Sequence, residues 1–295
     1  MRRKIQIKCK SPQLITMTNL TYAQVDSWYG HCVRDLKLDI IYPEDNTKKY
    51  PCVVWICGGA WLMLDKSAHL AYLSKIAQKG FVVASVEYRT SNEIQFPGQL
   101  EDVKAAIRYL KAHSDRFNID TEKFATMGES AGGYLASMAA LATDTNFDVG
   151  AYTEYSSRIQ ASIPWYPPTD FTNIEQLREA MSEYESDWVP PAQPLGVGPE
   201  SLLLGKDVKK YAKEAKEISP VNFVTESAPP MLIIHGTCDH TVPFSQGETL
   251  YEMLIEKGCD ATLIEIEDAD HADLRFFQDE IWEIMIEFLE DKLKQ

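Results

Sequence analysis

The stretch Phe124-Ala125-Thr126-Met127-Gly128-Glu129-Ser130-Ala131-Gly132-Gly133 decides how the rest of the sequence is interpreted. Its first four residues predict a short buried strand, and residues 134–141 predict a helix. Between them stands the Gly-x-Ser-x-Gly pattern of a nucleophilic serine on a sharp strand-to-helix turn. We expect Gly128 and Gly132 to avoid clashes between this turn and its neighbours. The sequence therefore predicts Ser130 as a nucleophile.

Two roles are possible for Ser130 in this turn. A serine before a helix is also a common N-cap, which is the alternative for Ser130. In the catalytic interpretation, the helix directs backbone N–H groups and positive partial charge toward a carbonyl oxygen under attack. That interpretation makes the N–H of Ala131 an oxyanion donor.

A serine nucleophile needs a base, and the base needs a carboxylate that fixes its tautomer. His271 stands in a polar loop after the strand-like residues 262–266, and His240 is the rival base. Asp239 follows the apolar run at 231–235, again at a strand's carboxyl end, where open α/β sheets place their sites. The chain order Ser130, Asp239, His271 is the order used by α/β-hydrolases. The other nearby acids are expected to solvate the loop or raise the pKa of its histidine: Asp268, Asp270 and Asp273.

Short apolar runs at 52–56, 81–86 and 231–234 are typical of strands buried on both faces of a parallel sheet. The alternation over 36–40 predicts an antiparallel strand at the sheet's edge. Helical apolar spacing at 103–110 and 281–289 separates such runs, which favours an α/β fold with a mostly parallel, doubly wound sheet and helices on both faces. One domain over 1–295 is expected, with an insertion at about 167–220 that is either a cap over the site or a peripheral element.

The turn Trp55-Ile56-Cys57-Gly58-Gly59-Ala60-Trp61 follows the first parallel strand. Its N–H groups are candidates for the second half of an oxyanion hole. The alternative is a βα turn whose glycines only permit tight geometry.

Composition limits the kinds of partner that the protein is expected to bind. The formal net charge of −15 gives no electrostatic footprint for nucleic acid. The six cysteines have neither CxxC pairing nor metal-ligand spacing, which predicts free thiols and no metal. No apolar run is long enough for a membrane span and no secretory signal forms at the amino terminus, so a cytoplasmic protein is expected.

These motifs together resemble the esterase/lipase group of α/β-hydrolases related to hormone-sensitive lipase, and especially its feruloyl-esterase-like carbohydrate esterase branch. The resemblance runs from about residue 35 to the end and also includes Tyr88-Arg89, Phe96-Pro97 and Ser219-Pro220. It implies the triad above, an oxyanion hole made by the N–H groups of Gly59, Ala60 and Ala131, and neither metal nor organic cofactor. Cys57 and Ala60 depart from the family's H-G-G-G-W: cysteine cannot reproduce the hydrogen bonds of an imidazole, and alanine resists a positive φ.

The resemblance implies a serine carboxylic-ester hydrolase for small-molecule or oligosaccharide esters, with acyl, cinnamoyl or acetyl esters of plant-derived sugars preferred. A general short-chain carboxylesterase, a prolyl-oligopeptidase-like peptidase and a non-catalytic binding protein are the alternatives. Aromatic residues near the site are candidates to stack on substrate, although they also suit a small core: Trp61, Trp165 and Trp188.

Overall fold

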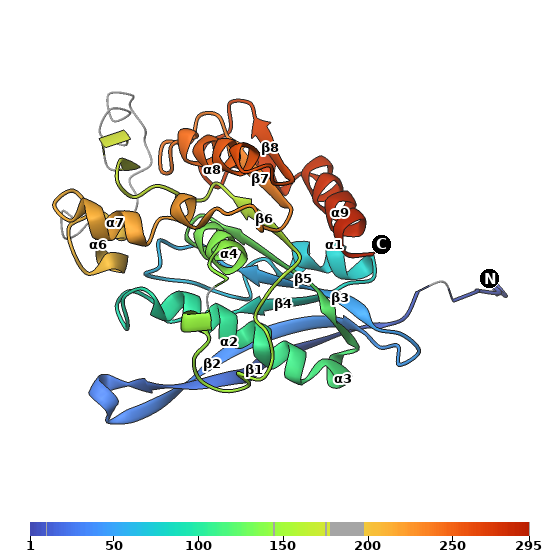
Figure 1. Cartoon of the computed structure of the whole chain (residues 1–295). Helices are drawn as coiled ribbons and strands as arrows, with labels where there is room; N and C mark the ends of the chain where they lie inside the picture. The colour runs from blue at the N-terminus through green and yellow to red at the C-terminus, as the bar shows by residue number, and fades with distance from the viewer. Residues whose placement is uncertain (10, 144, 175, 178–197, 295) are drawn as a thin grey trace.

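The computed structural model describes residues 1–9, 11–143, 145–174, 176–177 and 198–294 (Figure 1). Within them one sheet of eight strands has the order β1-β2-β4-β3-β5-β6-β7-β8. From β4 to β8 every neighbouring pair is parallel, whereas β2 is antiparallel to both β1 and β4. The strands are β1 (Leu14–Ser27), β2 (Cys32–Pro43), β3 (Tyr50–Ile56), β4 (Val82–Val86), β5 (Ile119–Glu129), β6 (Ala161–Trp165), β7 (Met231–Gly236) and β8 (Ala261–Ile266).

The apolar runs are strands, as predicted, and the residues of β3, β4 and β7 are buried throughout because helices cover both faces of the sheet. One prediction about the edge is wrong. The alternating strand at 36–40 is antiparallel, but it is the second strand, since β1 pairs along its outer side. The exposed, twice-shifted β1 has no clean alternation that would announce it.

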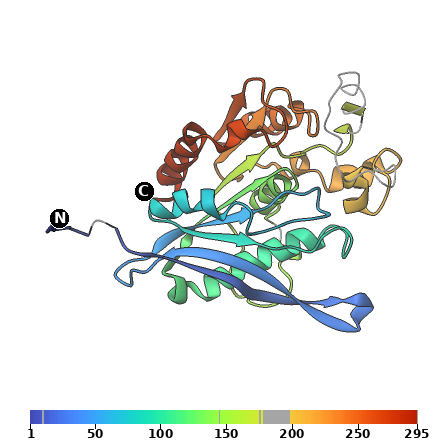
Figure 2. The same cartoon turned by 180° about the vertical axis from the view of Figure 1, so that it is seen from behind.

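Helices form two layers (Figures 1 and 2). Buried side chains of α2, α4 and α8 share one core cluster with Val54 and Ile56, whereas those of α1 and α9 share another with Val53 and Trp55. Alternate residues of β3 thus point into opposite cores, as the pleat of a strand requires. The helices are α1 (Leu70–Gln78), α2 (Gly98–Ala112), α3 (Ser114–Phe117), α4 (Ala131–Leu141), α6 (Pro199–Leu204), α7 (Ala212–Glu217), α8 (Ser245–Glu256) and α9 (Asp279–Leu293), with 3-10 turns η1 (Trp28–Gly30), η2 (Thr145–Phe147), η3 (Pro220–Phe223) and η4 (Leu274–Phe277).

The predicted insertion begins just after β6, and its described part includes α6 and α7. Residues 178–197, and Trp188 with them, lie outside the described residues. The phenol of Tyr134 on α4 donates to the carbonyl of Ile218 at 2.9 Å, and the amide of Phe96 donates to that of Leu203 at 2.9 Å. The described insertion is therefore fastened to the core near α4 and α2. Its role as a cap stays a prediction.

None of the helices in the described ranges is both long and apolar enough to cross a lipid bilayer.

Candidate active site

Ser130 stands between β5 and α4 with φ 53° and ψ −120°, a conformation that L-residues adopt rarely. The glycines around it permit this turn. A Cβ on Gly128 would lie 2.4 Å from the carbonyl oxygen of Gly132, and a Cβ on Gly132 would lie 2.0 Å from that of Ile56. The Ser130 side chain makes no capping hydrogen bond to α4, which removes the N-cap alternative.

The structure brings the three predicted triad residues together. Nε2 of His271 lies 3.0 Å from Oγ of Ser130, and Nδ1 of His271 lies 2.8 Å from Oδ2 of Asp239. Each side chain follows a strand: Ser130 follows β5, Asp239 follows β7 and His271 follows β8. Because these strands are parallel, their carboxyl ends share one edge of the sheet.

Asp239 is fully buried and held by its own loop. Its Oδ1 accepts the backbone N–H groups of Thr241 at 2.9 Å and Val242 at 2.7 Å. Burial acts to raise the pKa of Asp239, but the charge of His271 and hydrogen bonds from His235 and His271 outweigh burial, so the pKa lies well below its ordinary value. Asp239 is therefore ionised, and its Oδ2 can accept a proton carried by Nδ1 of His271.

The rival base has a different partner. Nδ1 of His240 lies 3.1 Å from Oδ2 of Asp270, whose Oδ1 also accepts the backbone N–H groups of His240 and His271 at 2.9 and 2.7 Å. Asp270 thus ties the His271 loop to the Asp239 loop. Asp273 accepts the backbone N–H of Arg275 at the start of η4, and its Oδ2 pairs with the Arg275 guanidinium.

The turn after β3 has a run of positive φ values: 122° at Gly59, 55° at Ala60 and 56° at Trp61. The carbonyl of Gly59 accepts the N–H groups of Leu62 and Met63 at 3.0 and 3.1 Å. A Cβ on Gly59 would lie 1.9 Å from the carbonyl oxygen of Met63, so the turn requires glycine there. Ala60 adopts the positive φ that alanine resists. Ala131 opens α4, where an N–H has no acceptor within the helix.

The two described tryptophans of the predicted substrate set are buried, and they lie in different cores. Trp61 is 1% exposed and packs edge-on against Tyr134 and Phe171. Trp165 is fully buried, and its indole N–H donates to the sulfur of Met285 on α9 at 3.1 Å. Both rings therefore serve packing in this structure, and they form no shared platform for a substrate ring.

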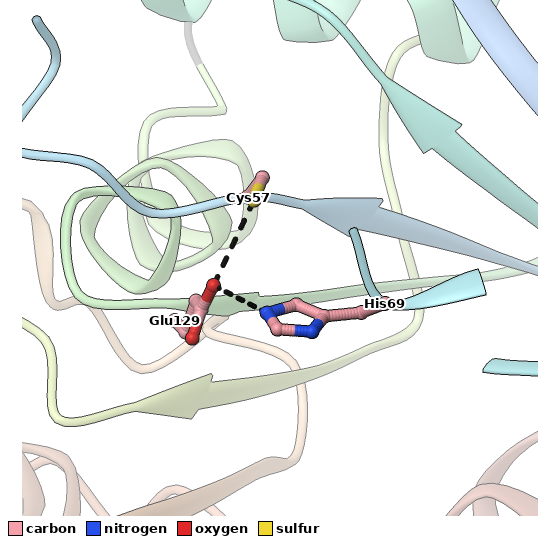
Figure 3. A group of neighbouring side chains, drawn as sticks. All are labelled: Cys57, His69 and Glu129. Carbon is pink, nitrogen blue, oxygen red and sulfur yellow. Dashed lines mark hydrogen bonds and ion pairs between the residues drawn. The ribbon is translucent and has the colours of Figure 1, made fainter. Parts of the chain in front are cut away.

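A polar cluster that no sequence pattern indicates lies behind the Ser130 turn and is made of Cys57, His69, Glu129 and Tyr166. Figure 3 shows the Glu129 carboxylate between Cys57 and His69. Oε1 of Glu129 lies 2.8 Å from Nε2 of His69 and 3.7 Å from the Cys57 sulfur, and it accepts the Gly58 N–H at 3.4 Å. Its Oε2 accepts the Tyr166 phenol at 2.8 Å.

This cluster connects the turn after β3 to the predicted triad. The ring of Tyr166 lies 4.5 Å from that of His271, centroid to centroid, in an edge-on contact. Burial acts to raise the pKa of Glu129, but hydrogen bonds from His69 and Tyr166 and the charge of His69 lower the pKa below its ordinary value. Burial, and then Glu129, raise the pKa of the Cys57 thiol to about 12. An ionised carboxylate thus stands directly beside the nucleophile.

The BD-FAE family model matches residues 38–254, which include most of the sheet, the nucleophile turn and Asp239. The chain belongs to the BD-FAE family. The match ends before His271, so the triad histidine is assigned by its contacts with Ser130 and Asp239.

Relatives of this BD-FAE chain are named as esterases. The "Probable carboxylic ester hydrolase LipM" of Mycobacterium tuberculosis (strain ATCC 25618 / H37Rv) is 32% identical over 78% of the chain and 51% of its own length. The chain spans about half the length of the curated relatives it matches first.

Two solved structures share the α/β-hydrolase fold that the sequence predicted. A "Truncated form of carbohydrate esterase from gut microbiota" is 29% identical, with a TM-score of 0.79, covering 97% of this chain and all of that one. A "Bifunctional GH43-CE" of Bacteroides eggerthii is 27% identical, with a TM-score of 0.77, covering 94% of this chain and 38% of that one. The predicted fold is confirmed.

Proposed function

We propose that this protein is a serine carboxylic-ester hydrolase that works through an acyl-enzyme. The observation that carries the proposal is the continuous hydrogen-bond chain from Ser130 through His271 to Asp239, with separations of 3.0 and 2.8 Å. Membership of the BD-FAE family and the esterase names of its relatives support the same reaction.

In the proposed mechanism, Oγ of Ser130 attacks the ester carbonyl while Nε2 of His271 takes the hydroxyl proton. Asp239 keeps the other ring proton on Nδ1 and stabilises the imidazolium that forms. Collapse of the tetrahedral intermediate breaks the bond to the alcohol, which leaves with the proton from Nε2. A water then gives its proton to His271 and attacks the acyl-serine, so that the acid departs and Ser130 regains its proton.

The negative charge of each tetrahedral intermediate falls on the former carbonyl oxygen. We assign its stabilisation to the backbone N–H groups of Gly59, Ala60 and Ala131, which lie on the turn after β3 and at the start of α4. Removing one such donor typically costs about 100- to 1,000-fold in rate. The support for this assignment is the positive-φ turn beside Ser130 and the lack of an intrahelical acceptor for Ala131.

For the substrate we propose small acyl, acetyl or cinnamoyl esters of plant-derived carbohydrates. A solved structure named as a carbohydrate esterase, which covers 97% of this chain, supports a sugar alcohol. The acyl part is the less constrained half, since the buried Trp61 and Trp165 offer no exposed ring to a cinnamoyl group.

The test is hydrolysis of p-nitrophenyl acetate, p-nitrophenyl octanoate, methyl ferulate and an acetylated xylo-oligosaccharide by the wild type, Ser130→Ala and the control Ser227→Ala. The wild type and the control, an exposed serine far from the turn in sequence, should cleave members of the panel. Ser130→Ala should lose on the order of 10⁴-fold or more. Equal activity in Ser130→Ala would contradict the proposed mechanism. A preference for p-nitrophenyl octanoate would contradict the proposal that carbohydrate esters are the substrates.

A further inference from the structure

Behind the nucleophile turn, Cys57, His69 and Glu129 offer one sulfur, one nitrogen and one oxygen within 4.8 Å of one another (Figure 3). They come from the end of β3, the residue before α1 and the end of β5, so their spacing in sequence has no metal-site pattern. We propose that these three side chains form a binding site for a borderline-soft divalent cation, Zn²⁺ or Cd²⁺. Its occupation lowers ester hydrolysis, a consequence that rests on the function proposed above.

The separations are near those of a coordination sphere. A tetrahedral zinc with bonds of about 2.3 Å to sulfur and 2.0 to 2.1 Å to nitrogen or oxygen holds its ligand atoms roughly 3.3 to 3.6 Å apart. Oε1 of Glu129 lies 3.7 Å from the Cys57 sulfur and 2.8 Å from Nε2 of His69. The Cys57 sulfur and the His69 ring nitrogen lie within 4.8 Å of each other, so side-chain shifts of about 1 Å would enclose the cation.

Charge balance favours a divalent ion. Glu129 supplies a carboxylate, and Cys57 supplies a thiol that binds a metal as the thiolate. Binding releases the thiol proton to solvent and forms a metal–sulfur bond, and His69 gives up the proton that its Nε2 shares with Glu129, so that the neutral imidazole can bind. One carboxylate and one thiolate then neutralise a divalent cation, so the buried cluster carries no net charge.

The donor set selects the metal. A thiolate with an imidazole suits Zn²⁺ or Cd²⁺, whereas Mg²⁺ and Ca²⁺ prefer oxygen ligands alone. Three protein ligands leave a fourth position for water. Access is from the side of His69, whose side chain is 19% exposed, whereas Cys57 is buried.

Binding of a cation at this site would affect ester hydrolysis through the Glu129 carboxylate. Oε1 of Glu129, which would become a ligand, accepts the N–H of Gly58 on the turn after β3. Glu129 also precedes Ser130 in the nucleophile turn. A cation that shifts this oxygen and takes one of its lone pairs weakens the tether on the turn that carries the oxyanion donors.

The first experiment measures binding without activity. Full-length reduced protein, freed of metal by a chelator, is titrated with Cd²⁺ while the ultraviolet charge-transfer band of a cadmium–thiolate bond is followed. Equilibrium dialysis with Zn²⁺ gives the stoichiometry. We expect the wild type and the exposed-thiol control Cys32→Ser to bind one cation with a thiolate band that Mg²⁺ does not produce.

Two variants locate the site. Cys57→Ser should lose the band, and His69→Gln should bind Cd²⁺ at least about tenfold more weakly. Near-ultraviolet circular dichroism establishes that each is folded. Because His69 is partly exposed, His69→Gln tests the site even where the buried Cys57→Ser is destabilised. A band that survives in folded Cys57→Ser, or wild type without any band, would overturn the proposal.

The second experiment tests the consequence. Zn²⁺ should lower p-nitrophenyl acetate hydrolysis by the wild type over the concentration range in which dialysis shows one bound ion, and a chelator should reverse the loss. In His69→Gln the inhibition should move to at least about tenfold higher Zn²⁺. Inhibition unchanged by His69→Gln would place the inhibiting ion elsewhere, for example at His271. Wild type that binds Cd²⁺ but cleaves no ester would refute the proposed function and leave the cation site standing.

Discussion

The substitution Asp239→Asn is a sharp test of the triad because the structure fixes how the new amide must lie. Oδ1 of Asp239 accepts two backbone N–H groups, from Thr241 and Val242, at 2.9 and 2.7 Å. An amide nitrogen there would face two donors, so the asparagine must keep its carbonyl oxygen at that position. Its NH₂ group then takes the place of Oδ2, 2.8 Å from Nδ1 of His271.

An NH₂ group at this place reverses the tautomer of His271. Nδ1 must accept a hydrogen bond, so the ring proton moves to Nε2, which faces Oγ of Ser130 at 3.0 Å. An imidazole with its proton on Nε2 cannot accept the serine proton. We expect kcat/KM to fall by roughly 10³- to 10⁴-fold, which corresponds to about 4 to 5.5 kcal/mol of lost transition-state stabilisation.

The assay is p-nitrophenyl acetate hydrolysis at pH 7.5 or so, with Asp268→Asn as the matched control. Asp268 lies in the His271 loop, its side chain is exposed and its φ of 55° suits asparagine. The control should stay within about threefold of wild type, since it removes one surface charge and no contact with the triad. A loss under tenfold in Asp239→Asn, or an equal loss in both variants, would refute the orienting role of Asp239.

Three further predictions follow from contacts described above. Gly132→Ala should destabilise the fold by about 2 kcal/mol or more in urea unfolding, because its Cβ would lie 2.0 Å from the carbonyl oxygen of Ile56; an unchanged midpoint would mean that the turn adjusts freely. Glu129→Gln should lower the free energy of unfolding by roughly 1 to 3 kcal/mol at pH 7, and the deficit should shrink below about pH 4, because a lowered pKa stabilises the fold only while the carboxylate is ionised. A deficit independent of pH, or one matched by the exposed control Glu226→Gln, would contradict this ion pair. His240→Ala should keep kcat/KM within about tenfold of wild type, since its ring bonds a carboxylate outside the triad, and a collapse of activity would reinstate it as the base.

The meeting of Ser130, Asp239 and His271 was predictable because each of them follows a strand that the sequence pattern indicates. Ser130 is embedded in a local pattern, and Asp239 and His271 each follow an apolar or strand-like run. Parallel topology then brings the carboxyl ends of those strands to one edge. The sequence predicts this meeting without any long-range information.

The Glu129 cluster had no such signal. His69 and Glu129 are 60 residues apart, and each alone has an ordinary interpretation: one precedes a helix, and the other is the variable position of the motif. The strand β1 was missed for a related reason, since its partial exposure and shifted register erase the alternation that marked β2. The predicted substrate contacts of Trp61 and Trp165 depended on their exposure, and both side chains are buried. Composition does not show whether an aromatic ring faces a cleft or a core.

The positive φ of Ala60 bears on how this protein can be altered. A glycine at this position would reach the same backbone angle without steric cost, but it would also open many other angles to the turn. Alanine restricts the loop to fewer shapes and accepts local strain in return. Ala60→Gly is therefore the substitution to try first when laboratory evolution aims to broaden the substrate range. Any side chain at Gly59 would collide with the Met63 carbonyl, so this position does not tolerate substitution.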